Sequence, residues 1–168
     1  LWVFQDNRID IPMDSIELSR AEAITLGEKY LAENNLQLAE GYQGYATYNA
    51  HNHSDAFVWQ ELGESVYKNW LGSYLKTPGW SIRFVNYEGT VESKNEEINL
   101  RMDLEGRVNY FDHTIPEERA GASLSKEAAK VIADRAIQER FGLNIASLKM
   151  VSEISEQQPN RMDWTFVY

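Results

Sequence analysis

Two histidines and an aspartate stand at alternate positions in the first half of the chain: His51, His53 and Asp55. Alternate residues of a strand point to the same face, so a strand here would gather two imidazoles and a carboxylate, which are ligands that zinc accepts. The intervening asparagine and serine are equally typical of an exposed turn, whose solvated side chains need no metal. We favour the turn and keep these three residues as the metal-binding candidates. The sequence indicates no cofactor.

A second set of residues matches a motif of proteases in its amino-acid sequence. Glu96–Arg101 spells E-E-x-x-x-R, a string that provides the general base of intramembrane metalloproteases, where it lies on a membrane helix. Here Ile98, Leu100 and Met102 alternate with polar residues, as in a strand with one buried face. A catalytic glutamate also needs a water-excluding site that tunes its pKa, whereas charged residues flank this one. We therefore interpret the string as coincidental.

Other catalytic signatures are missing from the sequence. It contains no G-x-S-x-G elbow, no P-loop, no G-x-G-x-x-G string after a strand and no H-E-x-x-H pair. The chain has no cysteine, which excludes thiolate catalysis, disulfides and cysteine-ligated zinc. We predict that this segment carries no catalytic residue and is not an enzyme.

Aromatic side chains offer a different kind of site, a groove for an extended peptide near an edge strand. The candidates recur at spacings of two on predicted strands or four on a predicted helix: Trp59, Trp70, Trp80, Tyr110, Trp164 and Phe166. The same spacings place aromatic residues in a core between sheet and helices, where each buries about 150–250 Å². We favour the core for each of them.

Composition limits the class of partner. The net charge of −10 repels phosphate backbones, so nucleic acid is not expected. No apolar run reaches the roughly 18 residues of a membrane helix, and the segment itself is not expected to span a bilayer. It begins Leu1–Phe4 without a methionine and ends within a strand-like alternation, which we interpret as a piece of a longer protein. The apolar start is typical of the trailing end of a membrane helix or of a first strand or loop that packs on the core, and these four residues alone favour the strand or loop.

An internal repeat determines the architecture that must position these residues. Leu18–Ala23 returns 106 residues later as Leu124–Ala129, and in each copy a serine precedes the apolar spacing of a helix. Farther along, Asp55–Trp59 resembles Asp163–Phe166. We expect an α+β fold of two pseudo-repeats, each a helix packed on antiparallel strands.

Apolar spacing predicts about three helices and seven strands. The helices are expected at 19–34, 61–75 and 125–141. The strands are expected at 42–48, 55–60, 80–85, 97–103, 107–113, 148–154 and 162–168, with the first two paired as a hairpin.

These elements suggest four stretches along the chain. Residues 1–17 form a lead-in that trails a membrane helix in one interpretation, and 18–79 form the first α+β repeat with an extra helix. Residues 80–116 form a central β-meander, and 117–168 form the second α+β repeat. No linker-like stretch separates them, so the repeats are expected to be fused rather than independent.

Two known families resemble this pattern. The D-x-x-G-x-V turn at Asp103–Val108, after a helix and strands, resembles the PepSY-type modules of protease propeptides and bacterial envelope proteins. A longer series adds the W-x-x-R-F strand at Trp80–Phe84, then His113–Glu117, Gly121–Leu124 and Arg161–Phe166. In that order the series resembles the soluble N-terminal region before the membrane helices of bacterial CPBP-family (CAAX protease-like) intramembrane metalloproteases.

The resemblance implies a non-catalytic recognition or regulatory module of a bacterial membrane protein, anchored at the membrane with this domain on the extracytoplasmic side. Its partner would be a protein or peptide, or the membrane-embedded part of its own chain. The family's glutamate and histidine metal site lies in membrane helices, so no catalytic residue carries over. Two alternatives stay open: a PepSY-like protease-inhibitory module of the propeptide type, and a metal-binding or hydrolytic protein using His51, His53 and Asp55.

Overall fold

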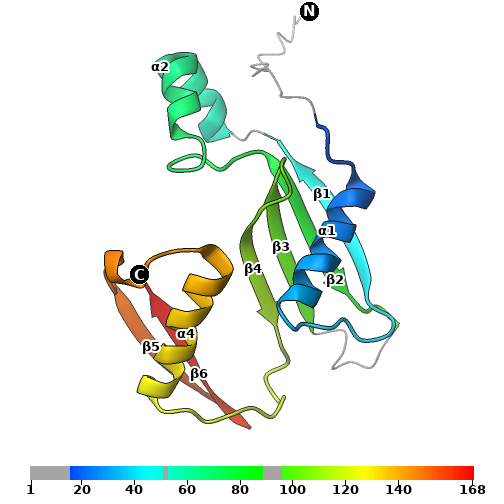
Figure 1. Cartoon of the computed structure of the whole chain (residues 1–168), viewed down its shortest axis with the longest axis vertical. Helices are drawn as coiled ribbons and strands as arrows, with labels where there is room; N and C mark the ends of the chain where they lie inside the picture. Colours follow the sequence, from blue (N-terminus) through cyan, green and yellow to red (C-terminus); the bar gives the residue numbers. More distant parts are fainter. Residues whose placement is uncertain (1–15, 51–52, 89–95) are drawn as a thin grey trace, which may run out of the picture. The chain divides into compact units, whose positions relative to one another are not determined.

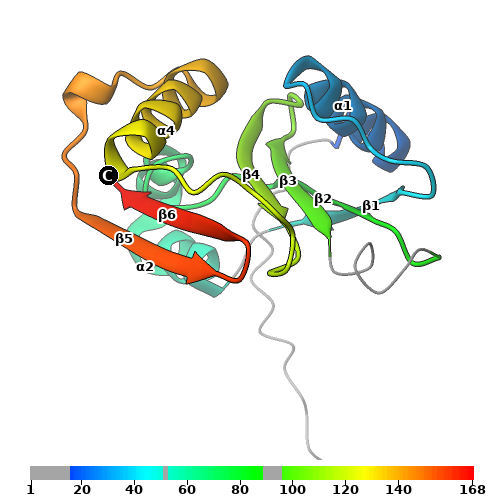
Figure 2. The same ribbon diagram turned by 90° about the horizontal axis from the view of Figure 1, so that it is seen from below.

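The computed structural model of the 168-residue chain describes residues 16–50, 53–88 and 96–168. Within these ranges the fold is α+β, with three α-helices, a short 3-10 helix and six strands in two sheets. The chain divides into two compact units, the first ending at His113 and the second comprising Thr114–Tyr168. Each unit contains one sheet and a helix packed on it (Figures 1 and 2).

The first unit is built on a four-stranded sheet in the order β1-β2-β3-β4. Its elements, in chain order, are α1 (Arg20–Glu33), β1 (Gln43–Asn49), α2 (His53–Trp70), β2 (Gly79–Val85), β3 (Glu97–Asp103) and β4 (Val108–Thr114). Each of the pairs β1–β2 and β2–β3 is antiparallel. Helix α1 crosses one face of this sheet (Figure 1).

Helix α1 begins at the predicted capping box. The Ser19 hydroxyl accepts a hydrogen bond from the Glu22 backbone N–H over 3.3 Å, and the Glu22 carboxylate accepts one from the Ser19 backbone N–H over 2.9 Å. These bonds lower the pKa of Glu22. The helix buries Ala23, Gly27 and Leu31, which recur every four residues and therefore share the face toward the sheet.

The core of the first unit lies between α1 and the central strands. Trp80, Ile82 and Phe84 of β2 are buried, and β3 pairs its own buried residues Met102, Leu100 and Ile98 with them in that order. Each such apolar side chain contributes about 1.5–3 kcal/mol when it is buried. The helix approaches the sheet closely at Gly44, where a Cβ would lie 2.8 Å from Ile24 and 2.9 Å from Phe84.

The turn between β3 and β4 is organised by Asp103. Its Oδ1 accepts hydrogen bonds from the backbone N–H groups of Glu105 and Arg107, and its Oδ2 accepts one from the Arg107 side chain over 2.8 Å. Gly106 has φ +81°, the left-handed region that favours glycine. The D-x-x-G part of the predicted turn thus has a physical role for both of its fixed residues.

Helix α2 corrects the prediction for residues 55–60. They form the first half of this helix and not a strand, so the described part of the chain has six strands and β1 pairs with β2 alone. Asp55 and Val58 are buried three positions apart, as on one face of a helix. The helix breaks at Gly63, where φ is +83°, and its second half packs Tyr67 against Trp59. Six residues were too few to separate a period of two from one of 3.6.

The second unit has a two-stranded sheet. It comprises α4 (Lys126–Phe141), a 3-10 helix at Ile145–Ser147, β5 (Ser152–Gln158) and β6 (Arg161–Val167), with β5 and β6 antiparallel. The predicted strand 148–154 therefore begins four residues later than expected. Helix α4 starts after Ser125 and ends at Gly142, whose φ is +65°, and it lies on one face of the sheet (Figure 2).

Polar contacts join α4 to the strands beneath it. Lys126 forms an ion pair with Glu153 of β5 over 2.7 Å. Asp134 accepts hydrogen bonds from Lys130 and from the Tyr168 hydroxyl, which lower the pKa of Asp134. The bond to Asp134 raises the pKa of Tyr168.

One hydrogen bond occurs in both units and supports the internal repeat. In the first unit the indole N–H of Trp80 donates to the carbonyl oxygen of Leu18 over 3.0 Å. In the second unit the indole N–H of Trp164 donates to the carbonyl oxygen of Leu124, also over 3.0 Å. Each leucine precedes the serine that caps its helix, so α1–β1–β2 corresponds to α4–β5–β6, with α2 inserted between the strands of the first copy.

Candidate functional site

The face of the first sheet that lies opposite α1 carries polar and aromatic side chains. Strand register places Tyr45, Arg83 and Asn99 in one row across β1, β2 and β3. A second row contains Thr47, Ser81 and Arg101. Strand β4 adds residues beside each row. We call this surface the open face and define it by Tyr45, Thr47, Ser81, Arg83, Asn99, Arg101, Tyr110 and Asp112.

The first row is satisfied by its own partners. The Arg83 guanidinium donates to the Glu97 carboxylate through Nε over 2.7 Å and also through Nη2. Asn99 donates to the same carboxylate over 2.9 Å and to Asp112 over 3.4 Å. Hydrogen bonds from Asn99 and then Arg83 lower the pKa of Glu97, and the Glu97 carboxylate raises the pKa of Arg83. These hydrogen bonds link neighbouring strands. They also occupy most of the polar groups of the row, so few of them remain to bind a ligand.

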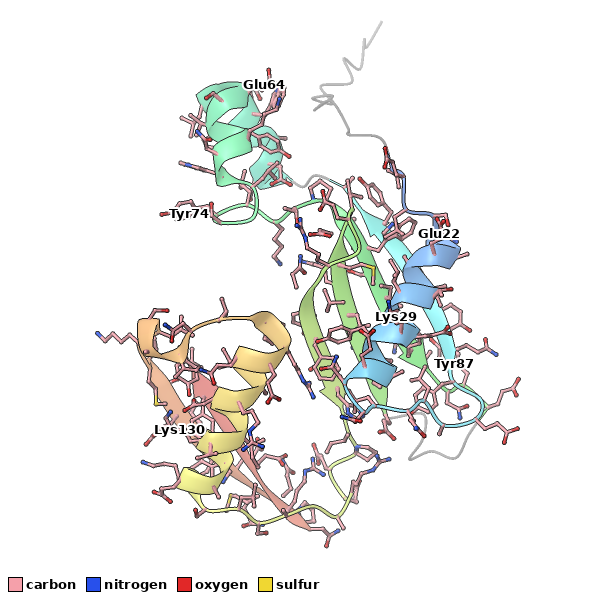
Figure 3. All side chains as sticks on the ribbon, in the orientation of Figure 1. Glu22, Lys29, Glu64, Tyr74, Tyr87 and Lys130 are labelled. Carbon is pink, nitrogen blue, oxygen red and sulfur yellow. The ribbon has the colours of Figure 1, made fainter. Side chains whose placement is uncertain are left out.

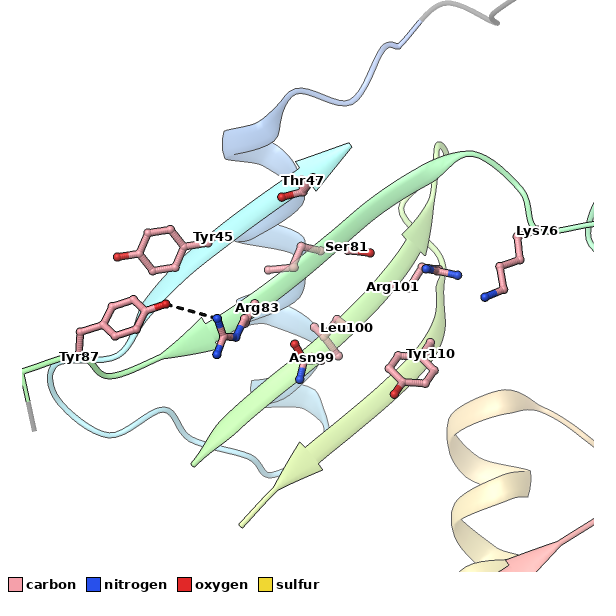
Figure 4. A pocket seen from close by; sticks show the side chains of 11 residues that line it. Tyr45, Thr47, Lys76, Ser81, Arg83, Tyr87, Asn99, Leu100, Arg101 and Tyr110 are labelled. Carbon is pink, nitrogen blue, oxygen red and sulfur yellow. Dashed lines mark hydrogen bonds between the residues drawn. The ribbon is translucent and has the colours of Figure 1, made fainter. Parts of the chain in front are cut away.

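The second row contains a positively charged side chain, that of Arg101, which can bind a ligand. Within the described residues, no side-chain hydrogen bond or ion pair engages Arg101 of β3 or Lys76 of the segment before β2. Figure 4 shows both side chains directed toward a common space near Tyr110. We call Lys76 and Arg101 the cationic pair. Tyr110 lines the same hollows and is 52% exposed, so its aromatic ring also borders this space.

The open face is hollowed around these residues. A depression of about 750 Å³ extends over it from Tyr45 and Tyr87 to Tyr110. Two adjoining hollows, of about 430 and 400 Å³, are also lined by both members of the cationic pair. Several surface depressions therefore meet where Lys76 and Arg101 lie.

The candidate metal-binding residues are only partly described by the structure. His51 lies outside the described residues, and His53 is the first residue of α2. Asp55 is 1% exposed in that helix and lines the 430 Å³ hollow together with the cationic pair. His53 and Asp55 thus lie on a helix, where alternate residues do not share a face, and not in the turn that the sequence favours. Across residues 16–50, 53–88 and 96–168 no three acidic or histidine side chains are arranged to hold a metal.

The E-E-x-x-x-R string lies on a strand, as expected. Glu97 and Arg101 point to the open face, and Glu97 is engaged by Arg83. Glu96 contacts the imidazole Nε2 of His113 at 2.8 Å, where β3 begins and β4 ends. Glu96 and Glu97 thus have structural partners.

The aromatic candidates separate into two groups. Trp80 is 6% exposed in the core, and Trp59, Trp70, Trp164 and Phe166 are half-buried against their own helices or strands. Tyr110 corrects the prediction that every one of them is a core residue, because it lies exposed on the open face. Its neighbours along β4 are polar or face α1, so an alternation count alone could not show which side of the sheet stays uncovered.

The open face has the chemistry of a binding surface. A guanidinium binds carboxylates through two parallel hydrogen bonds, and an ammonium adds charge without fixed direction. Exposed tyrosines supply apolar contact area with a polar tip. Sequence reasoning missed Lys76, Thr47 and Ser81 because nothing local marks them. The pairing of β1, β2 and β3 brings Thr47 and Ser81 beside Arg101, and Lys76 lies in the segment that leads into β2.

Comparison of the chain with protein-family models, curated protein sequences and solved structures gave no match. Among the described residues, no helix combines the length and the apolar composition of a membrane span.

Proposed function

We propose that this chain is a non-catalytic protein-recognition module and that the open face binds an extended, acidic segment of a partner protein. The observation that carries the proposal is the cationic pair, Lys76 and Arg101, which has no partner among the described residues and borders three hollows. Asp55 lines one of these hollows but not the other two, and a ligand carboxylate bound there would reduce the repulsion between Lys76 and Arg101.

Charge favours a peptide carboxylate over a nucleic acid. The chain has a net charge of −10, so its overall field repels a polyanion, while the local cations can still bind one or two carboxylates. The open face also presents hydroxyl groups in a row from Thr47 to Ser81, beside Arg101. An extended peptide lying across the strands would meet the cations at one end of this row and the Tyr45 ring near the other.

We further propose that the module serves a bacterial membrane protein of the CPBP type, on the extracytoplasmic side, where it recruits or gates the substrate of the protease. The ordered motifs from Trp80–Phe84 to Arg161–Phe166 support this assignment. The structure gives the motif residues structural roles: Trp80 bonds to Leu18, Asp103 organises its turn, and Trp164 bonds to Leu124. A recognition surface outside the membrane would complement a reaction centre inside it.

An array of extended synthetic peptides, each about ten residues long, tests the proposal directly. The 168-residue chain is expected to bind acidic members of the array, and a Thr47→Trp variant that fills the open face is expected to lose this binding. Thr25→Trp is the matched control, because Thr25 is exposed on α1 and lies on the other side of the sheet. Circular dichroism establishes that both variants remain folded.

Three results would overturn the proposal. The first is binding that survives Thr47→Trp as well as it survives Thr25→Trp, which would place the ligand elsewhere. The second is zinc-dependent proteolysis by the isolated chain, which would make it an enzyme. The third is absence of binding to any acidic peptide.

A further inference from the structure

The two copies of the repeat differ in how well their cores are covered. In the first unit α1 buries Ala23, Gly27 and Leu31, and Trp80 is 6% exposed. In the second unit α4 has no buried residue, and the corresponding Trp164 is only half-buried. The same helix-and-strand arrangement therefore has a closed core in one copy and an open core in the other.

Strand β3 accounts for the difference. It lies beside β2 and opposes Trp80 and Ile82 with Met102 and Leu100, both nearly completely buried. In the second unit the sheet consists of β5 and β6 alone, so within the described residues β6 is paired with a strand on one side only. The loop before α4 contacts the start of β6 at Arg161 but forms no strand beside it. Because Trp164 corresponds to Trp80, the open edge of β6 occupies the position at which β2 receives β3.

The helices also differ in how well their apolar residues are covered. The turn after β3 places Gly106 against Leu26 of α1, where an added Cβ would lie 2.7 Å from the Leu26 Cδ1. The repeat aligns Leu26 with Ile132 of α4, which is 57% exposed. An apolar residue that the β3–β4 turn covers in the first unit is thus left uncovered in the second.

We propose that the free edge of β6 accepts an extended strand from a partner polypeptide, with apolar residues at alternate positions as in β3. The strand would pair antiparallel with β6, as β3 pairs with β2, and would set its apolar side chains beside Trp164 and Phe166. Addition of a strand to a sheet edge is a common mode of peptide recognition, in which backbone hydrogen bonds give affinity and alternate side chains give specificity. This site lies in the second unit and does not depend on the open face of the first.

The probe is a synthetic peptide with the Glu97–Asp103 sequence, capped at both ends and carrying lysine in place of its two terminal acids to offset the negative charge of the chain. A control peptide has the same composition with its apolar residues contiguous. We expect the alternating peptide to shift the Trp164 indole resonance of the 168-residue chain and to slow amide exchange along β6. The contiguous control is expected to bind at least about tenfold more weakly, since it cannot match the pleat.

N-methylation distinguishes strand pairing from side-chain adsorption. Two further peptides carry N-methyl groups on alternate residues, one set on each edge of the strand. Pairing with β6 requires the amides of one edge only, so one methylated peptide should bind like the parent and the other should lose at least about tenfold in affinity. This test changes no residue of the protein, so its folding is not at risk.

Several outcomes would overturn the inference. Equal binding of both methylated peptides would mean that no strand pairing occurs, and no binding by the parent peptide would remove the site. Sedimentation showing a dimer with β6 protected in the absence of peptide would assign the edge to a second copy of the chain. Loss of binding in the Thr47→Trp variant would place the peptide on the open face, whereas retention there separates this site from the proposed one.

Discussion

The indole N–H of Trp164 donates a hydrogen bond to the carbonyl oxygen of Leu124 over 3.0 Å, from the second strand of the second unit to the residue before the helix cap. The same relationship joins Trp80 to Leu18 in the first unit. The bond satisfies a carbonyl at the entry to a helix and ties that helix end to the sheet. Its recurrence gives a structural basis for the repeat that the leucine-serine pattern suggested.

Replacing each tryptophan by phenylalanine tests how much these hydrogen bonds contribute to the free energy of unfolding. Trp80→Phe and Trp164→Phe each remove the donor, and each is expected to lower the free energy of unfolding of its unit by about 1 kcal/mol from the hydrogen bond alone. Trp80→Phe should cost more, because Trp80 is 6% exposed and a smaller ring leaves a cavity. Urea unfolding followed by amide resonances of each unit measures both changes. Equal losses would contradict the difference in core closure.

Arg161 is expected to be essential for the loop that precedes α4. It is 6% exposed, and its Nη1 donates to the backbone carbonyls of Pro116, Glu117 and Arg119 over 2.7, 3.2 and 3.0 Å. Its Nε also donates to Asp163 over 2.8 Å, and lysine keeps the charge but has a single nitrogen, so it cannot make both sets of bonds. Arg161→Lys should therefore destabilise the second unit by about 2–3 kcal/mol, because hydrogen bonds from a charged, buried donor are lost.

Amide exchange of residues in β6 and α4 measures that loss. Arg140→Lys provides a control for the general effect of the substitution, since it changes the same side chain at the end of α4. Exchange in the first unit should be unchanged in both variants. If the amides of β6 and α4 exchange as slowly in Arg161→Lys as in the parent chain, the guanidinium does not stabilise the loop before α4.

Glu97 should make the stability of the first unit depend on pH. Hydrogen bonds from Asn99 and Arg83 lower its folded-state pKa below the ordinary value of 4.5. A carboxyl with a depressed folded-state pKa stabilises the fold fully above its unfolded-state pKa, and this contribution is lost as the pH falls through the folded-state value. The stability difference between the parent chain and Glu97→Gln should therefore be largest near neutral pH and shrink below pH about 4.5.

The expected size of this effect is modest, because the Arg83 side chain is half exposed and solvent screens the pair. Urea midpoints between neutral and acidic pH, recorded for both chains, give the difference directly. Glu33→Gln, which alters an exposed pair on α1, is the control and should shift the midpoint little. A Glu97→Gln difference that grows on acidification would contradict the assigned direction.

The parts of the fold that the sequence predicted are those with local or strongly periodic signals. The Ser19 and Glu22 capping box specified where α1 begins, and the alternation of Ile98, Leu100 and Met102 specified a strand that buries one face. The alternation of Phe57 and Trp59 predicts a strand where the structure has the first half of α2, because the stretch is too short to distinguish a period of two from one of 3.6. Tertiary packing determined the outcome there.

The candidate site was less predictable than the fold. In the sequence, Arg101 belongs to a motif only as the last residue of the E-E-x-x-x-R string, which does not indicate its position on the open face. Lys76 belongs to no motif. Their proximity depends on the register between β2 and β3 and on where the chain enters β2. Which face of a sheet a helix covers is likewise decided by the whole fold, so the exposure of Tyr110 could not be derived from its neighbours.

The most direct test of the recognition proposal is the affinity of an acidic peptide, selected on the array, for the 168-residue chain and two charge-reversal variants measured by calorimetry. Arg101→Glu should weaken binding about ten- to hundredfold, since a charge-assisted hydrogen bond is replaced by repulsion. Lys29→Glu changes the net charge equally but lies on α1 (Figure 3), and it should leave the affinity within about threefold. Equal weakening by the two variants would contradict recognition at the cationic pair.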